Sequence, residues 1–215
     1  MLLRAPELKT HTLVRIRGPQ ALAMASGSDL PDWAAGSLRR APWVVVRRAP
    51  VHGALLPIGV RGESRQQRFA AWLSPAEVLE LATPQALASY KPTRVVAALA
   101  VLPHVESIMR EHGLARLWGP AGSVGFELAS GKPTVTASSD FDLVIEIAQP
   151  SLIVSSAVSL WNALAELPAR VDALLETPHG AVALSEYARA RAGDIHHSFV
   201  LRTLTGPRLV ESIVG

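Results

Sequence analysis

Residues 141–147 carry the pattern that most constrains the fold of this chain. Every second position holds a large apolar side chain: Phe141, Leu143, Ile145 and Ile147. The positions between them include two carboxylates, Asp142 and Glu146. Because successive side chains of a strand point to opposite faces, this alternation predicts a strand with one buried face. The chain must therefore build a sheet that is covered on at least one side.

The rest of the second half supplies elements to cover and extend such a sheet. Helical periodicity predicts helices over residues 93–112, 151–167 and 181–191. Short apolar runs predict strands over residues 116–118, 170–176 and 198–204. Helices and strands that alternate in this way favour the α/β (α+β) class, with a mixed sheet covered by helices.

The first half predicts a smaller α/β unit. Apolar runs separated by Pro and Gly indicate strands over residues 12–16, 43–47 and 55–60. Residues 61–72 are predicted to be a helix. Ser74 is followed by Pro and then Glu at the spacing of a capping box, so it is the predicted N-cap of a second helix.

The two halves also differ in charge. Residues 1–90 contain eleven Arg and Lys against six Asp and Glu, whereas residues 91–215 contain ten against twelve. Two prolines, Pro84 and Pro92, mark a joint between them. We therefore predict a basic N-terminal α/β domain over 1–90 and a second domain over 91–215. A solvated, arginine-rich surface is the simpler explanation of the charge itself.

Composition excludes several classes of protein. Hydrophobic residues make up 49% of the chain and charged residues 18%, which argues against disorder. No apolar run approaches the roughly 20 residues of a membrane span. The chain has no cysteine, so it has no disulfide and no thiolate metal site. The charged N-terminus does not resemble a signal peptide, and we expect a cytoplasmic enzyme.

Three features in the second half together indicate a site for phosphate chemistry. Gly122 and Ser123 form a turn that leads toward a helix, where backbone N–H groups bind anions. Asp140 and Asp142 stand two apart at the start of a strand, so both carboxylates share a face. Asp172 lies in a later strand. Hard divalent cations prefer such oxygen ligands, and three carboxylates suit a two-metal site.

Each of these features is weak evidence when taken alone. A Gly-Ser pair is usually only a turn, and two aspartates at this spacing more often lie in an exposed loop. Asp172 by itself would more often be a salt-bridge partner. The ordered set, with each member on the expected element, favours a functional site.

These residues resemble the signature of the DNA polymerase beta-like nucleotidyltransferase superfamily. More narrowly, residues 118–131 and 139–143 are similar to the phosphoribosyl-dephospho-CoA transferases, the malonate decarboxylase holo-acyl-carrier-protein synthases. Further similarity to this family covers residues 42–48, 57–62, 65–68, 171–177 and 201–207. The spacing from Ser123 to Asp140 is longer than in most members of the wider superfamily, and Phe141 stands where Leu is commoner.

The resemblance implies a specific reaction. Members transfer the phosphoribosyl-dephospho-CoA part of 2′-(5″-triphosphoribosyl)-3′-dephospho-CoA to a serine of the apo acyl-carrier subunit of malonate decarboxylase, and diphosphate leaves. Asp140, Asp142 and Asp172 would hold Mg²⁺ or another divalent metal, and Asp172 is also a candidate base. Gly122 and Ser123 would bind the departing diphosphate.

Four basic side chains are further candidates for substrate binding. Arg61, Arg65 and Arg68 would share one face if residues 61–72 were helical, which suggests a clamp for the triphosphate or a surface for an acidic carrier. Lys132 lies in a loop and could reach a phosphate. For the three arginines we favour the functional explanation over an exposed helical face, and Arg61 is the strongest candidate. A lysine in a loop is usually only solvated.

Two other functions remain open at this point. The chain could be a nucleotidyltransferase acting on a different protein or small-molecule acceptor. It could also be an inactive nucleotidyltransferase fold used for binding, although the three retained aspartates argue against that. Long basic stripes are absent, so we expect no nucleic-acid partner, and we expect no membrane association.

Overall fold

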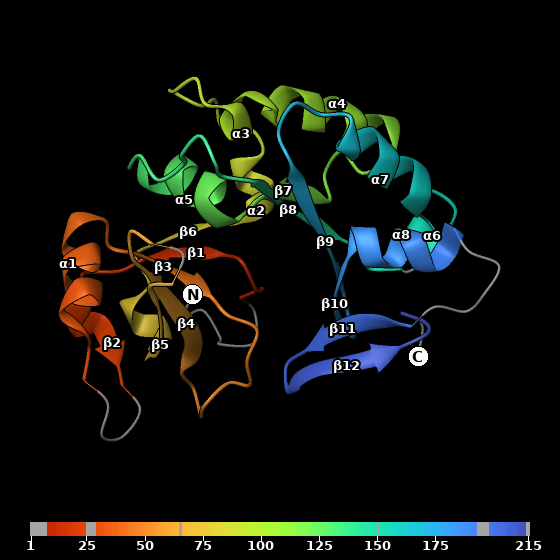
Figure 1. The fold of residues 1–215 in the computed structure, drawn as a ribbon. Helices are drawn as coiled ribbons and strands as arrows, with labels where there is room; N and C mark the ends of the chain where they lie inside the picture. The colour runs from red at the N-terminus through yellow and green to blue at the C-terminus, as the bar shows by residue number, and fades with distance from the viewer. Residues whose placement is uncertain (1–7, 25–28, 65, 150, 193–197, 214–215) are drawn as a thin grey trace. The chain divides into compact units, whose positions relative to one another are not determined.

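A computed structural model describes residues 8–24, 29–64, 66–149, 151–192 and 198–213. The chain forms two compact units (Figure 1). The first consists of Met1–Thr83 and Ala129–Thr134, and the second of Pro84–Leu128 and Val135–Gly215. The domain boundary near residue 90 stays a prediction.

The first unit is built on an antiparallel sheet with the strand order β2-β5-β4-β3-β1-β6. Its strands are β1 (Leu13–Arg15), β2 (Leu22–Ala23), β3 (Trp43–Val46), β4 (Leu56–Arg61), β5 (Arg68–Leu73) and β6 (Glu80–Ala82). Helix α1 (Asp32–Arg40) and the 3-10 turns η2 (Pro19–Ala21) and η3 (Pro75–Glu77) complete it. Buried Leu38 of α1 joins Val44, Ile58 and Leu73 of the sheet in one apolar core.

The predicted helix over residues 61–72 is wrong. Residue Arg61 ends β4 and Arg68 begins β5, and the two strands form an antiparallel hairpin. The Gln67 side chain closes the turn, because its Oε1 accepts hydrogen bonds from the N–H groups of Glu63 and Ser64 at 2.9 and 3.2 Å. Pairing with β4 buries Leu73 fully, and this tertiary gain outweighs the local helical preference.

Ser74 does act as an N-cap, although the helix that it begins is a single 3-10 turn. Its Oγ accepts a hydrogen bond from the Ala76 N–H at 3.3 Å. The chain then continues into the edge strand β6, which pairs with β1.

The second unit has the predicted mixed sheet covered by helices. The strand order is β12-β11-β10-β9-β8-β7, in which β8 and β9 are parallel and the other neighbours are antiparallel. The strands are β7 (Trp118–Pro120), β8 (Phe141–Glu146), β9 (Val171–Thr177), β10 (Gly180–Ala183), β11 (Phe199–Thr203) and β12 (Gly206–Val210). The fold class inferred from the sequence is confirmed.

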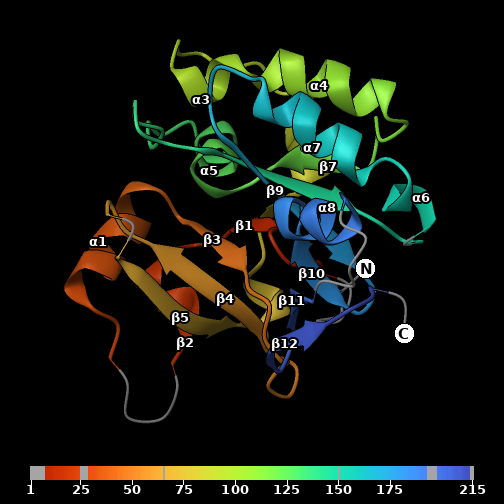
Figure 2. The same ribbon diagram turned by 45° about the vertical axis from the view of Figure 1, so that its right-hand side comes forward.

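Helices cover the apolar face of this sheet. They are α3 (Ala97–Ala100), α4 (Leu102–Glu111), α6 (Ser151–Val154), α7 (Ala157–Ala165) and α8 (Leu184–Ala192). Figures 1 and 2 both show α4 and α7 side by side above the sheet. Phe141, Leu143 and Ile145 of β8 are almost fully buried in a core shared with these helices. The remaining helices are α2 (Pro84–Leu87) and α5 (Gly122–Ser130).

Several predicted boundaries need correction. The helix expected over residues 181–191 begins only at Leu184, because residues 180–183 form β10. The helix expected over 151–167 is divided into α6 and α7, and the one over 93–112 into α3 and α4. Proline near the first turn of α4 explains the latter break, since it cannot donate to the preceding turn. Strand β12 was not predicted.

Among the described residues, no helix combines the length and the apolar character needed to cross a membrane.

Candidate active site

The parallel pair of strands β8 and β9 brings Asp142 and Asp172 together. The two residues are direct partners in the strand register, so their side chains lie on the same face of the sheet. Phe141 and Leu143, on either side of Asp142, point into the core, which places Asp142 on the opposite face. Two carboxylates from neighbouring strands thus project side by side.

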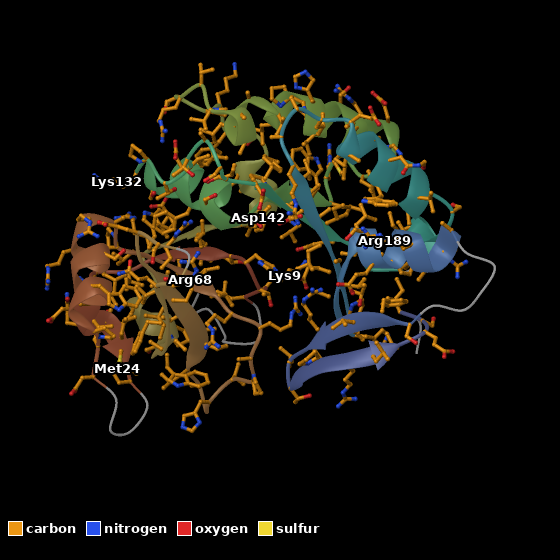
Figure 3. All side chains as sticks on the ribbon, in the orientation of Figure 1. Lys9, Met24, Arg68, Lys132, Asp142 and Arg189 are labelled. Atoms are coloured by element: carbon orange, nitrogen blue, oxygen red, sulfur yellow. The ribbon has the colours of Figure 1, made fainter. Side chains whose placement is uncertain are left out.

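Asp142 also lies directly against the first turn of α5. The Ala121 N–H donates to the Asp142 carbonyl oxygen at 2.8 Å. Gly122 has a φ of +55°, and a Cβ at this position would collide with Oδ2 of Asp142. The carboxylate therefore packs on the backbone of Gly122, with Ser123 next in the helix; Figure 3 labels Asp142 beside α5. A helix N-terminus favours a negative charge here.

This close approach predicts the effect of Gly122→Ala. The added methyl would displace the Asp142 carboxylate and would also force alanine into a left-handed conformation. We expect a loss of about 1–3 kcal/mol in the free energy of unfolding, measured by chemical denaturation, and a strong loss of activity.

Gly113→Ala is the matched control for that substitution. Gly113 has a φ of +73°, but a Cβ there would meet nothing within 4 Å. The Gly113→Ala variant should lose stability for the same reason, a left-handed alanine, but should keep its activity. Equal activity losses in the two variants would contradict the role given to the Gly122–Asp142 contact.

A second glycine shapes the same face of the sheet. Gly119 of β7 pairs with Val144 of β8, and a Cβ on Gly119 would collide with the carbonyl group of Pro84. The first residue of α2 can therefore pack directly on the sheet, on the face that carries Asp142. Any side chain at position 119 would push α2 away.

Asp172 is accessible and already has a cationic partner. Both Nε and one terminal nitrogen of Arg170 lie 3.0 Å from its Oδ1. The Asp172 side chain is 45% exposed and the Arg170 side chain 71% exposed. Exposed pairs of this kind contribute only about 0–1 kcal/mol, so Asp172 can exchange this partner for another cation at little cost.

Asp140 lies in the turn before β8, two residues ahead of Asp142, and is partly buried. Its neighbour Phe141 starts the strand, with its N–H donating to the Arg170 carbonyl oxygen at 2.8 Å. Within the described part of the chain, no group of three or more His, Asp or Glu side chains is arranged to hold a metal ion. The three-carboxylate metal site stays a prediction.

The donor chemistry of the paired aspartates nevertheless fits a small hard cation. Mg²⁺ usually binds to proteins through one or two carboxylates, and substrate phosphates and water complete its shell. Asp142 and Asp172 provide two such carboxylates on one face.

The predicted basic residues that the structure describes, Arg61, Arg68 and Lys132, belong to the first unit. Arg61 and Arg68 share a face, though as cross-strand partners in the β4–β5 hairpin rather than along a helix. Arg68, which is labelled in Figure 3, is exposed. Its terminal nitrogen donates to the carbonyl oxygens of Ser64 and Gln67 at 3.1 and 3.0 Å. Arg65 lies outside the described residues.

Lys132 follows the C-terminal end of α5, whereas Ser123 lies in the first turn of that helix. The Lys132 side chain is exposed, and its backbone N–H donates to Ser130 Oγ at 3.2 Å. Its proposed contact with phosphate stays a prediction.

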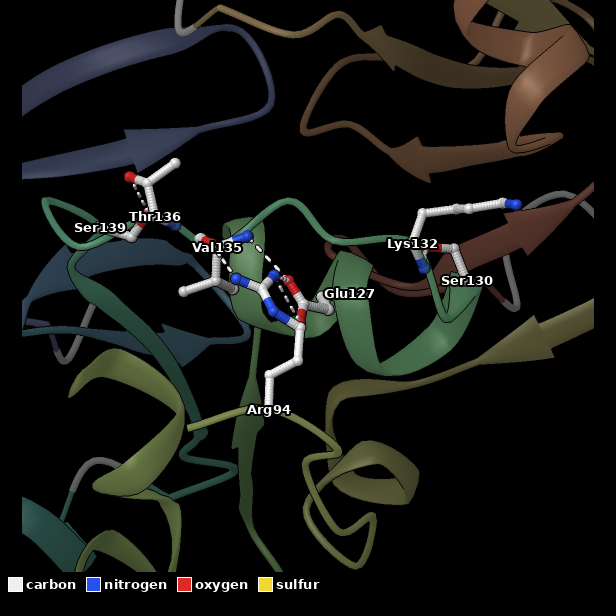
Figure 4. A network of polar contacts seen from close by, with 7 residues as sticks. All are labelled: Arg94, Glu127, Ser130, Lys132, Val135, Thr136 and Ser139. Atoms are coloured by element: carbon white, nitrogen blue, oxygen red, sulfur yellow. Dashed lines mark hydrogen bonds and ion pairs between the residues drawn. The ribbon is translucent and has the colours of Figure 1, made fainter. Parts of the chain in front are cut away.

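An ion pair that no sequence pattern predicted lies one turn beyond Ser123. Glu127 of α5 has a side chain that is only 8% exposed, and Arg94 binds both of its carboxylate oxygens (Figure 4). The one signal in the sequence was a carboxylate inside the otherwise apolar run of residues 124–128. A charge in such a position must be paired in the fold.

Comparison with known proteins matches most of the chain to one family. Residues 9–84 match the model of the N-terminal domain of phosphoribosyl-dephospho-CoA transferase MdcG, and residues 80–213 match that of its C-terminal domain. The chain belongs to this family. The resemblance of the sequence to the phosphoribosyl-dephospho-CoA transferases is therefore confirmed.

Individual members of the family align over most of the chain. Phosphoribosyl-dephospho-CoA transferases of Azotobacter vinelandii and Pseudomonas putida are each 38% identical to it, over 84% and 85% of both sequences respectively. The family member from Klebsiella pneumoniae is 35% identical over 94% of this chain and 93% of its own length. No solved structure matches the chain.

Proposed function

We propose that the chain transfers the phosphoribosyl-dephospho-CoA group from 2′-(5″-triphosphoribosyl)-3′-dephospho-CoA to a serine of the apo acyl-carrier subunit of malonate decarboxylase. Membership of the phosphoribosyl-dephospho-CoA transferase family supports the transferred group. The observation that carries the chemistry is the pairing of Asp142 with Asp172 beside the N-terminus of α5. In this proposal the site would provide oxygen ligands for a cation beside a helix N-terminus that favours an anion.

The reaction replaces a phosphoanhydride bond of the triphosphate by a phosphodiester bond to serine. The serine oxygen forms a bond to the phosphorus nearest the ribose, the bond from that phosphorus to the bridging oxygen breaks, and diphosphate leaves with the electron pair. The serine proton must go to a base. Exposed Asp172 is the candidate, because its carboxylate stands where solvent and an incoming side chain can reach it.

The other site residues have complementary roles. Asp142 and Asp172 would hold a divalent cation, which would supply charge neutralisation at the phosphates. The backbone around Gly122 and the hydroxyl of Ser123 would bind the departing diphosphate at the start of α5. Lys132, Arg61, Arg65 and Arg68 are candidates for binding the rest of the polyanionic substrate.

The proposed function has a direct test. The purified chain is incubated with apo carrier subunit, the triphosphoribosyl precursor and Mg²⁺, and the intact mass of the carrier is then measured. We expect a gain equal to one phosphoribosyl-dephospho-CoA group on a single serine, and none on a carrier with that serine replaced by alanine. Consumption of the precursor with no gain on the carrier would favour a different acceptor.

Metal removal gives a separate prediction for the same assay. Chelation of divalent cations should abolish transfer, because two carboxylates facing phosphates would then repel the substrate. Added Mg²⁺ should restore it. The far-UV circular dichroism should change little on chelation, because β8 and β9 are held by backbone pairing and a buried core. Full transfer in the presence of excess chelator would contradict the assigned role of the aspartates.

A further inference from the structure

Glu127 is a buried carboxylate inside α5, and burial of a charge is costly unless it is fully partnered. One terminal nitrogen of Arg94 lies 3.2 Å from its Oε1 and 3.1 Å from its Oε2. Arg94 itself lies in the segment before α3 and is 36% exposed. The pair therefore joins α5 to a segment that is distant in the sequence.

This pair also binds both backbone groups of Val135. The Val135 N–H donates to Glu127 Oε2 at 2.8 Å, and the Val135 carbonyl oxygen accepts from the second terminal nitrogen of Arg94 at 3.2 Å (Figure 4). The Val135 side chain is 2% exposed and belongs to the core. We call Arg94, Glu127 and Val135 the α5 clasp.

A short, internally bonded turn connects the α5 clasp to Asp140. The Thr136 N–H donates to Ser139 Oγ at 3.0 Å, and the Ser139 N–H donates to the Thr136 carbonyl oxygen at 3.1 Å. Beyond Asp140, the chain is held by Phe141, which is fully buried and bonded to the backbone of Arg170. Asp140 thus stands between two anchored residues, Val135 and Phe141.

We propose that Arg94 and Glu127 are positioning residues, which set the place of Asp140 relative to the first turn of α5. The inference rests on the proposed function, in which Asp140 serves the transfer reaction. Neither side chain needs to touch the substrate. Their effect passes through Val135 and the turn over residues 136–139 to the Asp140 carboxylate.

The test separates this positioning from a contribution to stability alone. Removing one member of a buried ion pair leaves the charge of the other unpaired and is destabilising. Replacing both members with apolar side chains often changes stability much less. Arg94→Met combined with Glu127→Leu should therefore lower the thermal midpoint less than Glu127→Leu alone, which leaves the Arg94 charge unpaired. The double variant should still release Val135, because leucine cannot accept its N–H.

Two measurements are made on this double variant. We expect kcat for carrier loading to fall on the order of 10- to 100-fold, since small misplacements of reacting groups have effects of this size. KM for the carrier should change much less. Amide hydrogen exchange should accelerate over residues 131–140 and remain unchanged in β9.

Matched variants give the controls. Arg15→Met with Glu80→Leu makes the same change in an exposed pair of the first unit and should preserve kcat. Arg94→Lys should give an intermediate kcat, because lysine keeps the charge but cannot bond Glu127 and Val135 together in the geometry of arginine. This single variant also serves if the double variant does not fold.

The outcomes distinguish the two proposals. If the unsubstituted chain does not load the carrier, the proposed function fails. The positioning inference is overturned if the unsubstituted chain loads the carrier and the double variant does so at the same kcat. If the double variant does not fold, the same comparison is made with Arg94→Lys. A loss of kcat without faster exchange over residues 131–140 would overturn it as well.

Discussion

Asp142→Asn is expected to lower the rate of carrier loading on the order of 10³-fold, because neutralisation of phosphate charge is a main source of catalysis in such reactions. Asparagine has nearly the same shape, so the contact with Gly122 and the pairing of β8 with β9 should persist. The substitution removes a favourable interaction with the α5 terminus but also relieves repulsion from Asp172. We expect the free energy of unfolding in chelator to change by less than about 1 kcal/mol.

The control for Asp142→Asn lies on the same strand and the same face. Glu146 is four residues further along β8 and pairs with Glu176 of β9, as Asp142 pairs with Asp172. Glu146→Gln removes one negative charge from this face without touching the proposed site, so transfer should continue near the normal rate. A folded Asp142→Asn protein with near-normal transfer would contradict the proposed mechanism.

Asp172→Asn is expected to produce a loss of similar size, whether Asp172 acts as base or as ligand. Its effect should not add to that of Asp142→Asn, because residues that act as one unit give strongly non-additive losses. The double variant should therefore transfer scarcely more slowly than either single variant. The measurement is the rate of carrier mass gain with saturating Mg²⁺ and precursor.

Glu176→Gln is the corresponding control on β9. The variant Arg170→Gln gives a further comparison, since it removes the cationic partner of Asp172 but leaves the carboxylate in place. Losses in the double variant that equal the product of the two single losses would show that the two aspartates act independently. That result would exclude a shared cation between them.

The sequence predicted strands well where alternation was strong. Residues 141–147 were predicted as a half-buried strand, and β8 has Phe141, Leu143 and Ile145 buried on one face. The prediction could not specify that β9 is the parallel neighbour, nor that Asp172 is the register partner of Asp142. Register depends on side chains from both strands and on the helices that cover them.

The wrong predictions arise where tertiary contacts override the local preference of the sequence for a helix or strand. Residues 61–72 have no strict alternation, but pairing with β4 and the side chain of Gln67 turn them into a hairpin. The α5 clasp was missed for a similar reason. A buried glutamate can be noticed in the sequence, but its partner Arg94 lies 33 residues away, and no local pattern identifies it.

The assignment of Ala129–Thr134 to the first unit has a consequence for synthesis on the ribosome. The first unit consists of residues up to Thr83 together with this later segment. Its contacts are therefore incomplete until well over half of the chain has been translated and has left the exit tunnel. By then α5 has also been made, and Val135 follows immediately as the first residue that returns to the second unit. Residues up to Thr83 alone would thus lack the contacts of this later segment. The first unit should reach its final form only after α5 has been made, and the second unit later still, because β8 to β12 follow.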